Sequence, residues 1–206
     1  MKNIYLNIYK ANFTNLKKAK ENIENNNIIG LPTETVYGLA GNAYSDKSIK
    51  KIYKLKKRPS FNPLIVHFKN LKELRKDVVC TKTFIKLYKA FCPGPITFVL
   101  NKKFNSKISK IATDGKKTVA VRIPKHTVAR NLLKILKVPL AAPSANISSK
   151  LSPTCASDIV DEFGGKINFI LDGGRCKIGL ESTIVDLTNK PTILRHGAIP
   201  EEKIYK

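Results

Sequence analysis

The spacing of apolar residues along the chain predicts short strands that alternate with helices. Isolated runs of three to six apolar residues are typical of buried strands, whereas apolar residues three or four positions apart mark the buried face of a helix. In Ser48–Lys56, for example, Ile49, Ile52 and Leu55 share one helical face.

Fifteen segments follow from this pattern. The predicted strands are Ile4–Tyr9, Ile28–Leu31, Leu64–Phe68, Ile96–Leu100, Thr118–Ile123, Leu140–Ala142, Phe169–Leu171, Thr183–Leu187 and Thr192–Leu194. The predicted helices are Leu16–Asn25, Ser48–Lys56, Leu71–Lys76, Thr83–Phe91, Val128–Leu136 and Ala156–Phe163. This alternation indicates the α/β class, in which polar residues after apolar strands converge on a cleft.

Length and composition favour one folded domain. The 206 residues contain no internal repeat and no Gly/Ser-rich linker, so we expect a single domain over residues 1–206. Hydrophobic residues make up 42% and charged residues 26%, an ordinary globular mixture. The sequence shows neither a signal peptide nor an apolar run of membrane-spanning length, which predicts a cytoplasmic protein without a membrane partner.

The chain is strongly basic, with 38 Lys and Arg against 15 Asp and Glu and a formal net charge of +23. A field of this sign attracts nucleotides and nucleic acids. The alternative is a lysine-rich surface set by genomic base composition, because Lys, Asn and Ile are all abundant. Charge alone therefore identifies no partner.

Metal and thiol chemistry have little support in the sequence. The four cysteines contain no C-x-x-C pair, and the three histidines lack metal-site spacing, so we predict reduced thiols and no protein-bound metal. The common phosphate and nucleophile motifs, such as G-x-x-x-x-G-K-[ST] and G-x-S-x-G, are also missing from the sequence. Any use of ATP therefore requires a different phosphate cradle.

Two segments near the N-terminus combine a strand or helix end with polar residues. In Leu31–Leu39, two hydroxyls, Thr33 and Thr35, flank Glu34, although capping of the next turn would explain them equally. In Lys56–His67, cations end a helix and a proline-framed loop leads into the next strand. Phosphate binding is one interpretation, and neutralisation of the helix dipole is the other.

Further candidates follow later strands. Arg122 ends the apolar run Thr118–Ile123, where it requires an anionic partner or access to solvent. Ala142–Asn146 places Ser144 and Asn146 directly after a strand, as cleft residues or as turn formers. The glycine-rich Leu171–Gly174, the run Gly179–Asp186 and the run Leu194–Gly197 complete the set, with hairpin turns and a surface ion pair as the alternative explanations.

These segments, in this order, resemble the YrdC/TsaC family of threonylcarbamoyl-AMP synthases from about Ile28 to Gly197. The resemblance rests on P-T-E-T-V-Y-G-L, K-K-R-P, N-P-L-I-V-H, C-P-G-P-I-T, V-A-V-R-I-P, P-S-A-N, D-G-G and E-S-T-I-V-D together. It implies a YrdC-like fold, in which a twisted mixed sheet flanked by helices carries a large basic concave cleft.

The resemblance also implies site residues, carried over position by position. L-Threonine would contact Thr35, His67, Arg122, Ala142 and Ser182, with Arg122 suited to its carboxylate by a two-pronged hydrogen bond. ATP would contact Lys56, Arg58, Asn62, Thr118, Ser144, Asn146, Ser152 and Arg195. Lys56 and Arg58 are the candidate catalytic residues, because they would neutralise charge that moves onto the leaving phosphate oxygens.

The implied reaction converts L-threonine, bicarbonate and ATP, with Mg²⁺, into L-threonylcarbamoyladenylate and pyrophosphate. The product would serve a separate threonylcarbamoyl transferase complex that forms N6-threonylcarbamoyladenosine at position 37 of tRNAs reading ANN codons. Direct contact with tRNA or double-stranded RNA is a further expectation. This chain would be the short type, which stops soon after the Arg-x-Gly segment.

Four positions depart from the family's pattern: Lys57, Phe61, Cys92 and His196. Two rival functions stay open at this point. One is an RNA-binding module of the same fold without catalysis, and the other is the carbamoyl-adenylate chemistry of the related domain in hydrogenase-maturation proteins.

Overall fold

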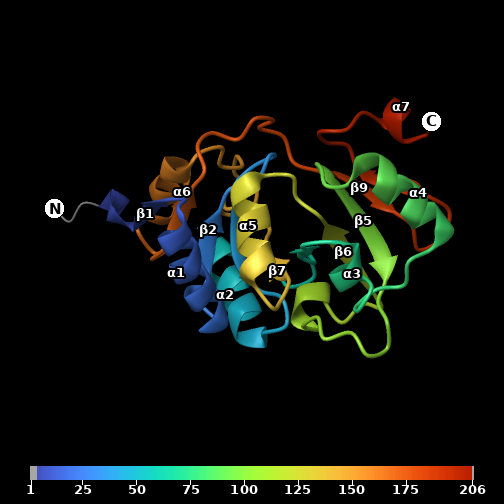
Figure 1. Ribbon diagram of the computed structural model, residues 1–206, viewed down its shortest axis with the longest axis horizontal. Coiled ribbons are helices and arrows are strands. Elements are labelled where there is room, and N and C mark those ends of the chain that lie inside the picture. Colours follow the sequence, from blue (N-terminus) through green and yellow to red (C-terminus); the bar gives the residue numbers. More distant parts are fainter. Residues whose placement is uncertain (1–3, 206) are drawn as a thin grey trace.

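The computed structural model describes residues 4–205, and in this part of the chain ten strands form one mixed sheet with helices around it (Figure 1). The strand order is β1-β8-β2-β3-β7-β4-β6-β5-β9-β10. The sheet contains both parallel pairs, such as β4 and β6, and antiparallel pairs, such as β5 and β6. The predicted α/β class is confirmed.

The strands are short, as the sequence predicts. They are β1 (Ile8–Lys10), β2 (Ile29–Leu31), β3 (Gly38–Asn42), β4 (Ile65–His67), β5 (Ile96–Asn101), β6 (Thr118–Arg122), β7 (Leu140–Ala141), β8 (Ile170–Asp172), β9 (Thr183–Asp186) and β10 (Thr192–Arg195).

The helices of the described residues are α1 (Phe13–Glu24), α2 (Asp46–Lys56), α3 (Leu71–Leu74), α4 (Lys82–Phe91), α5 (Thr127–Ile135), α6 (Ala156–Phe163) and α7 (Glu201–Ile204). Short 3-10 turns span Ile4–Asn7 and Ile111–Thr113. Several helices begin at a polar cap, as at Asn12, whose side chain accepts a hydrogen bond from the Asn15 backbone. None of the helices within residues 4–205 is long and apolar enough to cross a membrane.

Two predictions about strands were wrong. The segment Ile4–Tyr9 is a 3-10 turn followed by β1, because β1 pairs only with the three residues of β8. The strand β3 was missed because its two glycines resemble a loop. Those glycines permit close packing: a Cβ at Gly38 would lie 3.2 Å from the Pro143 carbonyl oxygen.

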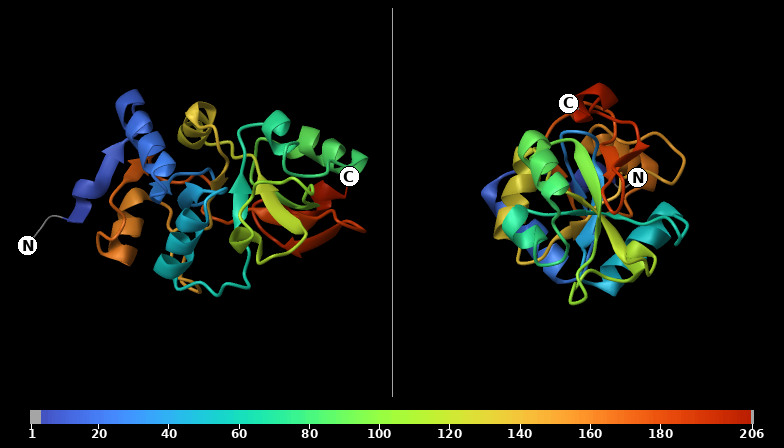
Figure 2. Two further views of the ribbon diagram at one scale, coloured as in Figure 1. Left: turned by 90° about the horizontal axis from the view of Figure 1, so that it is seen from below. Right: turned by 90° about the vertical axis from the view of Figure 1, so that its right-hand side faces the viewer.

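Helices lie on both sides of the sheet (Figure 2), and the buried apolar side chains form two clusters. Neighbouring residues of β8 face opposite ways, so that Ile170 belongs to the same cluster as Ile159 of α6, while Leu171 belongs to the cluster that contains residues of α1 and α5. Because both faces are covered, the polar residues that follow the strands are confined to the strand ends.

Those strand ends meet near the middle of the molecule. In the parallel pair of β4 and β6, His67 lies opposite Arg122. Ser182 immediately precedes β9, which pairs with β5, and an isolated bridge joins Gly38 to Ser144. Segments distant in sequence therefore place their polar side chains around one point.

The backbone conformation of Lys57, at the end of α2, leads to a testable prediction. Lys57 has φ 49° and ψ 38°, a left-handed conformation that glycine adopts without the Cβ penalty. We expect Lys57→Gly to raise the free energy of unfolding by about 0.5–1 kcal/mol, net of glycine's greater entropy loss. Denaturant unfolding would measure it. Lys57→Ala, which keeps the Cβ, should change little, and an equal gain in both variants would contradict the backbone explanation.

Candidate active site

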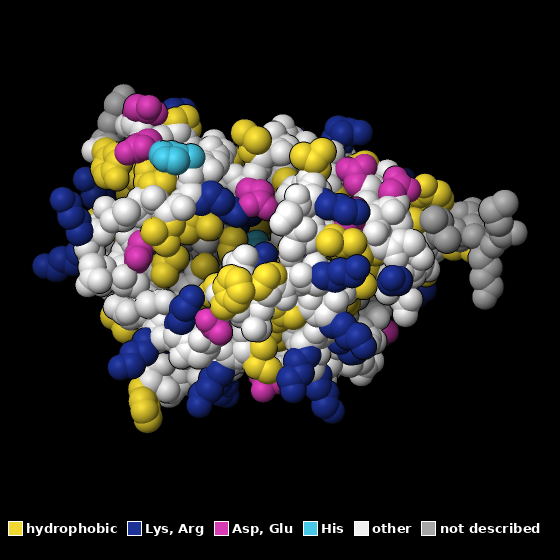
Figure 3. Space-filling model, turned by 180° about the vertical axis from the view of Figure 1, so that it is seen from behind, with side chains coloured by type: hydrophobic (Ala, Val, Ile, Leu, Met, Phe, Trp, Pro, Cys, Tyr) yellow, Lys and Arg dark blue, Asp and Glu magenta, His cyan; other side chains and the backbone are white. Residues whose placement is uncertain are grey.

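The strand ends surround a cleft that is open to solvent. On the face shown in Figure 3 the surface is hollowed near its centre, and Lys and Arg side chains lie around the hollow. The lining residues are Thr33, Thr35, Val36, Gly38, Arg58, Pro63, Ile65, His67, Arg122, Ala142, Pro143, Ser144, Glu181, Ser182 and Arg195.

The structure brings most of the predicted site residues into this lining and leaves the others outside it. Those in the lining are Thr35, Arg58, His67, Arg122, Ala142, Ser144, Ser182 and Arg195. The lining does not include Lys56, Asn62, Thr118, Asn146 and Ser152. Their contacts with ligands stay predictions.

Arg122, at the end of β6, is held by the loop that follows β2. Its Nη2 lies 2.8 Å from Glu34 Oε1, and its Nη1 donates to Thr35 Oγ1 at 2.9 Å. The Thr35 and Thr33 hydroxyls are 2.8 Å apart and share a further hydrogen bond. Arg122 is 5% exposed and Glu34 7%, so this ion pair is buried at the base of the cleft.

Glu34 is itself fixed by backbone donors. Its Oε2 accepts hydrogen bonds from the amides of Lys125 and His126, at 3.0 and 3.3 Å, just before α5. Burial alone would raise the pKa of Glu34, but the charge and hydrogen bond of Arg122 and the Lys125 amide together hold the pKa below its usual 4.5. Glu34 is therefore ionised at neutral pH.

His67 is buried at the end of β4. Desolvation, and then the nearby charge of Arg122, lower the pKa of His67 to about 3, although Glu34 acts in the opposite direction. The imidazole is therefore neutral at physiological pH. A neutral ring has one donor and one acceptor, which suits it to orient a hydroxyl or an amine rather than to bind an anion.

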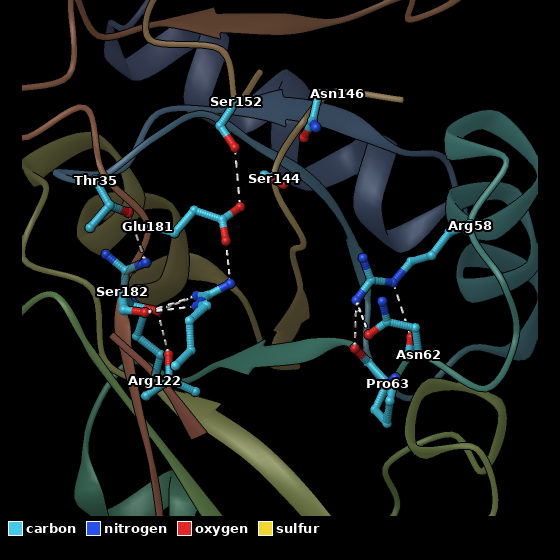
Figure 4. Close-up of polar contacts among 12 residues, drawn as sticks. Thr35, Arg58, Asn62, Pro63, Arg122, Ser144, Asn146, Ser152, Glu181 and Ser182 are labelled. Carbon is cyan, nitrogen blue, oxygen red and sulfur yellow. Dashed lines mark hydrogen bonds and ion pairs between the residues drawn. The ribbon is translucent and has the colours of Figure 1, made fainter. Parts of the chain in front are cut away.

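A second ion pair joins β10 to the loop before β9. Arg195 Nη1 contacts Glu181 Oε2, and Arg195 Nη2 donates to the Ser182 carbonyl and hydroxyl oxygens at 2.9 and 3.2 Å. The other oxygen of Glu181 accepts from Ser152 Oγ at 3.1 Å (Figure 4). The Ser182 hydroxyl lies 2.7 Å from that of Thr97.

Gly197 makes this turn possible. A Cβ at Gly197 would lie 2.5 Å from the Glu181 carbonyl oxygen and 2.6 Å from the Thr183 nitrogen, both backbone atoms. Only glycine therefore allows the Arg195-His196-Gly197 segment to approach the strand β9 this closely.

Lys56, at the last turn of α2, is 1% exposed. Its ammonium group donates to the backbone carbonyls of Ser144 and Asn146, in the loop after β7. Burial, and then the charge of Arg58, lower the pKa of Lys56 to about 8, while Glu181 acts in the opposite direction. Lys56 lies behind the cleft wall and fixes the loop that carries Ser144.

Across the cleft, Arg58 organises its own loop. Its side chain donates to the carbonyl and side-chain oxygens of Asn62, at 3.0 and 2.6 Å, and to the Pro63 carbonyl at 3.1 Å (Figure 4). Extending the register of β4 and β6 by two residues would set Thr118 opposite Pro63. Thr118 is thus at the end of β6 remote from Arg122, on the side of the Arg58 loop.

The other departures from the family's pattern also have defined surroundings. Phe61 is 70% exposed in the Arg58 loop. Cys92 precedes a cis peptide bond to Pro93, and burial raises the pKa of its thiol to about 12. His196 Nδ1 lies 3.8 Å from Glu201 Oε2, beyond the ion pair of Arg195. All four cysteines are free.

Sequence reasoning quoted Glu34 and Glu181 within their segments but assigned a site role to neither. Each is a carboxylate next to a hydroxyl residue, a pattern that helix and turn caps share. The structure makes each the counterion of a predicted site arginine. Which acid pairs with which arginine depends on the fold, so the sequence alone could not identify these two carboxylates.

Comparison with known families gives one extended match. The model of the Sua5, YciO and YrdC proteins, described as "Telomere recombination", matches residues 21–197. Those limits contain every predicted site residue.

Individual relatives agree with this match. The threonylcarbamoyl-AMP synthase of Pyrococcus abyssi is 45% identical over 188 residues, which are 89% of this chain and 54% of that protein. A relative from Methanocaldococcus jannaschii is 34% identical over 211 residues, covering 100% of this chain and 99% of its own length. The crystal structure of P. abyssi Sua5 complexed with L-threonine superimposes with a TM-score of 0.90 at 40% identity, covering 96% of this chain and 58% of that one.

The buried ion pair predicts a pH-dependent loss of stability in Glu34→Gln. Removing one partner of a buried pair costs about 3 kcal/mol, because the other charge stays desolvated. Since the folded pKa of Glu34 lies below 4.5, the full loss is expected above that pH and shrinks as the pH falls through the folded value. Urea unfolding at several pH values measures this. Glu24→Gln, from an exposed pair with Lys20, is the control and should cost under about 0.5 kcal/mol; a pH-independent loss in Glu34→Gln would contradict the assignment.

The environment of His67 predicts an imidazole that does not titrate near neutrality. Its ring proton resonance, assigned by its absence in His67→Gln, should keep a constant chemical shift from about pH 5 to 8, because its folded pKa is about 3. Nuclear magnetic resonance measures this directly. A midpoint above pH 5.5 would contradict the lowered pKa of His67.

Proposed function

Because the chain belongs to the Sua5/YciO/YrdC family, we propose that it forms L-threonylcarbamoyladenylate and pyrophosphate from L-threonine, bicarbonate and ATP. The chain spans about half the length of several relatives that carry this name, including the synthase of P. abyssi. The activity is therefore proposed for this chain on the chemistry of its own cleft.

The observation that carries the proposal is the fixed guanidinium of Arg122. Its position is set from two sides by Glu34 and Thr35, so little reorganisation is needed before it receives a carboxylate. Around it lie hydroxyls of Thr35 and Ser182, the neutral ring of His67 and the methyl of Ala142. This set matches an amino acid that has a hydroxyl and a methyl on its side chain. The L-threonine bound in P. abyssi Sua5 agrees with it.

The ATP side of the proposed site is cationic. Arg58, Ser144 and Arg195 all line the cleft. The nucleotide or its ribose would also contact Asn62, Asn146, Thr118 and Ser152. We propose that this set forms the large basic concave cleft expected of the family, and the Lys and Arg side chains around the hollow support that view (Figure 3).

In the proposed reaction, the amine of threonine attacks bicarbonate, and loss of water leaves a carbamate. A carbamate oxygen then attacks the α-phosphorus of ATP, and pyrophosphate leaves in line. The chain would contribute position and charge rather than a covalent nucleophile. Arg58 and Arg195 would stabilise negative charge on the phosphate oxygens, while Lys56 would act from behind through the loop of Ser144 and Asn146.

Mg²⁺ would enter as part of the MgATP substrate. No cluster of three or more His, Cys, Asp or Glu residues that could hold a metal occurs within residues 4–205. Glu181 is the carboxylate that lines the cleft, so phosphate oxygens would supply most of the ligands that Mg²⁺ requires.

We further propose that the product passes to a threonylcarbamoyl transferase complex acting at position 37 of tRNAs that read ANN codons. Formation of one domain by residues 1–206, a cytoplasmic location and direct contact with tRNA or double-stranded RNA stay predictions from the sequence. An RNA-binding module without catalysis is the alternative function, supported by the net charge of +23.

Arg122→Lys tests the proposed function. Lysine keeps the buried charge beside Glu34 but lacks the two-pronged fork, so kcat/KM for threonine should fall about 10- to 100-fold. Pyrophosphate release with ATP and bicarbonate, with and without L-threonine, measures this, and mass spectrometry identifies the adenylate. Arg75→Lys, at the exposed end of α3, is the matched control and should retain the native rate.

Two outcomes would contradict the proposal. Pyrophosphate release that does not depend on threonine would exclude this amino-acid substrate. Release from neither the native chain nor the control, together with salt-dependent RNA binding, would support the RNA-binding alternative.

A further inference from the structure

Glu181 has an unusual place among the cations assigned to ATP. Among the cleft-lining residues of the described chain, residues 4–205, it is the one carboxylate. It lies in the loop before β9, on the same side of the cleft as Ser152 and Ser182 (Figure 4). An acid at a site proposed for a polyanion would repel that ligand, so its contacts need an explanation.

Those contacts are with groups that the proposed function gives to ATP. One carboxylate oxygen accepts from Ser152 Oγ at 3.1 Å, and the other forms the ion pair with Arg195. The carboxylate of Glu181 therefore binds a hydroxyl donor and a guanidinium at the same time, as two oxygens of one phosphate group would.

The charge of Glu181 also reaches the other two cations. Burial lowers the pKa of both Lys56 and Arg58, and the field of Glu181 opposes that effect at each of them. Glu181 thus offsets the repulsion that Arg58 has with Lys56, behind the cleft wall, and with Arg195, in the cleft. Without a counterion these like charges would favour turning outward into solvent.

We propose that Glu181 is an internal stand-in for a phosphate group, which pairs with the ATP-binding donors until a polyphosphate displaces it. This inference rests on the proposed function, because that function assigns Ser152 and Arg195 to ATP. Glu181 and Arg195 are each about one-third exposed at the side chain (34% and 33%), so their pair can exchange with a ligand from solvent.

The displacement is connected to the threonine side of the cleft. Arg195 also donates to the carbonyl and hydroxyl oxygens of Ser182, a residue assigned to threonine. A phosphate that replaces Glu181 on Arg195 would therefore bind an arginine that also contacts Ser182 in the proposed threonine site. Glu181 is a positioning residue in this scheme, since it acts through Arg195 and Ser152.

Glu181→Gln tests the inference, because it keeps the shape and an acceptor for Ser152 but removes the charge. We expect the variant to bind Mg²⁺-free pyrophosphate about fivefold more tightly than the native chain, which is about 1 kcal/mol, measured by titration calorimetry at low salt. Glu202→Gln, an exposed residue of α7, makes the same change in net charge and should bind as the native chain does.

If the variant is less stable than the native chain, the rise in melting temperature on adding pyrophosphate provides a second measurement of binding. The melting temperature of the variant should then rise more per added pyrophosphate than that of the native chain. Equal or weaker binding by Glu181→Gln would overturn the inference while leaving the proposed function intact.

Two other results are decisive as well. Weaker binding of MgATP by Glu181→Gln, with unchanged binding of Mg²⁺-free pyrophosphate, would make Glu181 a metal ligand and overturn the stand-in role. Failure of the native chain and both variants to bind pyrophosphate would overturn the inference and the proposed function together.

Discussion

The rest of the site depends on a guanidinium buried in the middle of the sheet. Arg122 is 5% exposed, so its charge requires a counterion and directed acceptors inside the protein. Glu34 provides the charge, and Thr35 provides a hydroxyl oxygen. Glu34 is in turn desolvated, and the amides that precede α5 compensate it. One buried charge thereby ties together β6, the loop after β2 and the start of α5.

The two ion pairs of the cleft differ mainly in burial, and this difference determines what each can do. The side chains of Arg122 and Glu34 are 5% and 9% exposed, whereas those of Arg195 and Glu181 are 33% and 34% exposed. Water weakens an interaction between exposed charges several-fold relative to the interior. The inner pair is therefore held more firmly than the outer pair, which can open at a modest free-energy cost.

Much of the fold could be predicted from the sequence because its strands are short apolar runs. The short length of β1 and the presence of the glycine-rich β3 were not predicted. Both depend on hydrogen bonding to a neighbouring strand rather than on local composition. The expectation that polar residues at strand ends converge on a cleft correctly grouped Arg122, His67 and Ser182. The counterions Glu34 and Glu181 were not selected, because a carboxylate beside hydroxyls has the same local pattern whether it caps a turn or neutralises an arginine.

Lys56 shows which contacts the structure adds to a residue that the motif alone singles out. A lysine at a helix end before an arginine suggests a mobile cation that reaches phosphate. In the structure, however, Lys56 is buried and is held in place by hydrogen bonds to two backbone carbonyls. An ammonium has three donors, and the carbonyls of Ser144 and Asn146 take two of them. The third donor makes only a long contact of 3.5 Å with Asn146 Oδ1. Lys56 therefore holds the loop after β7 in place through its two carbonyl bonds, and its direct contact with an anion stays a prediction.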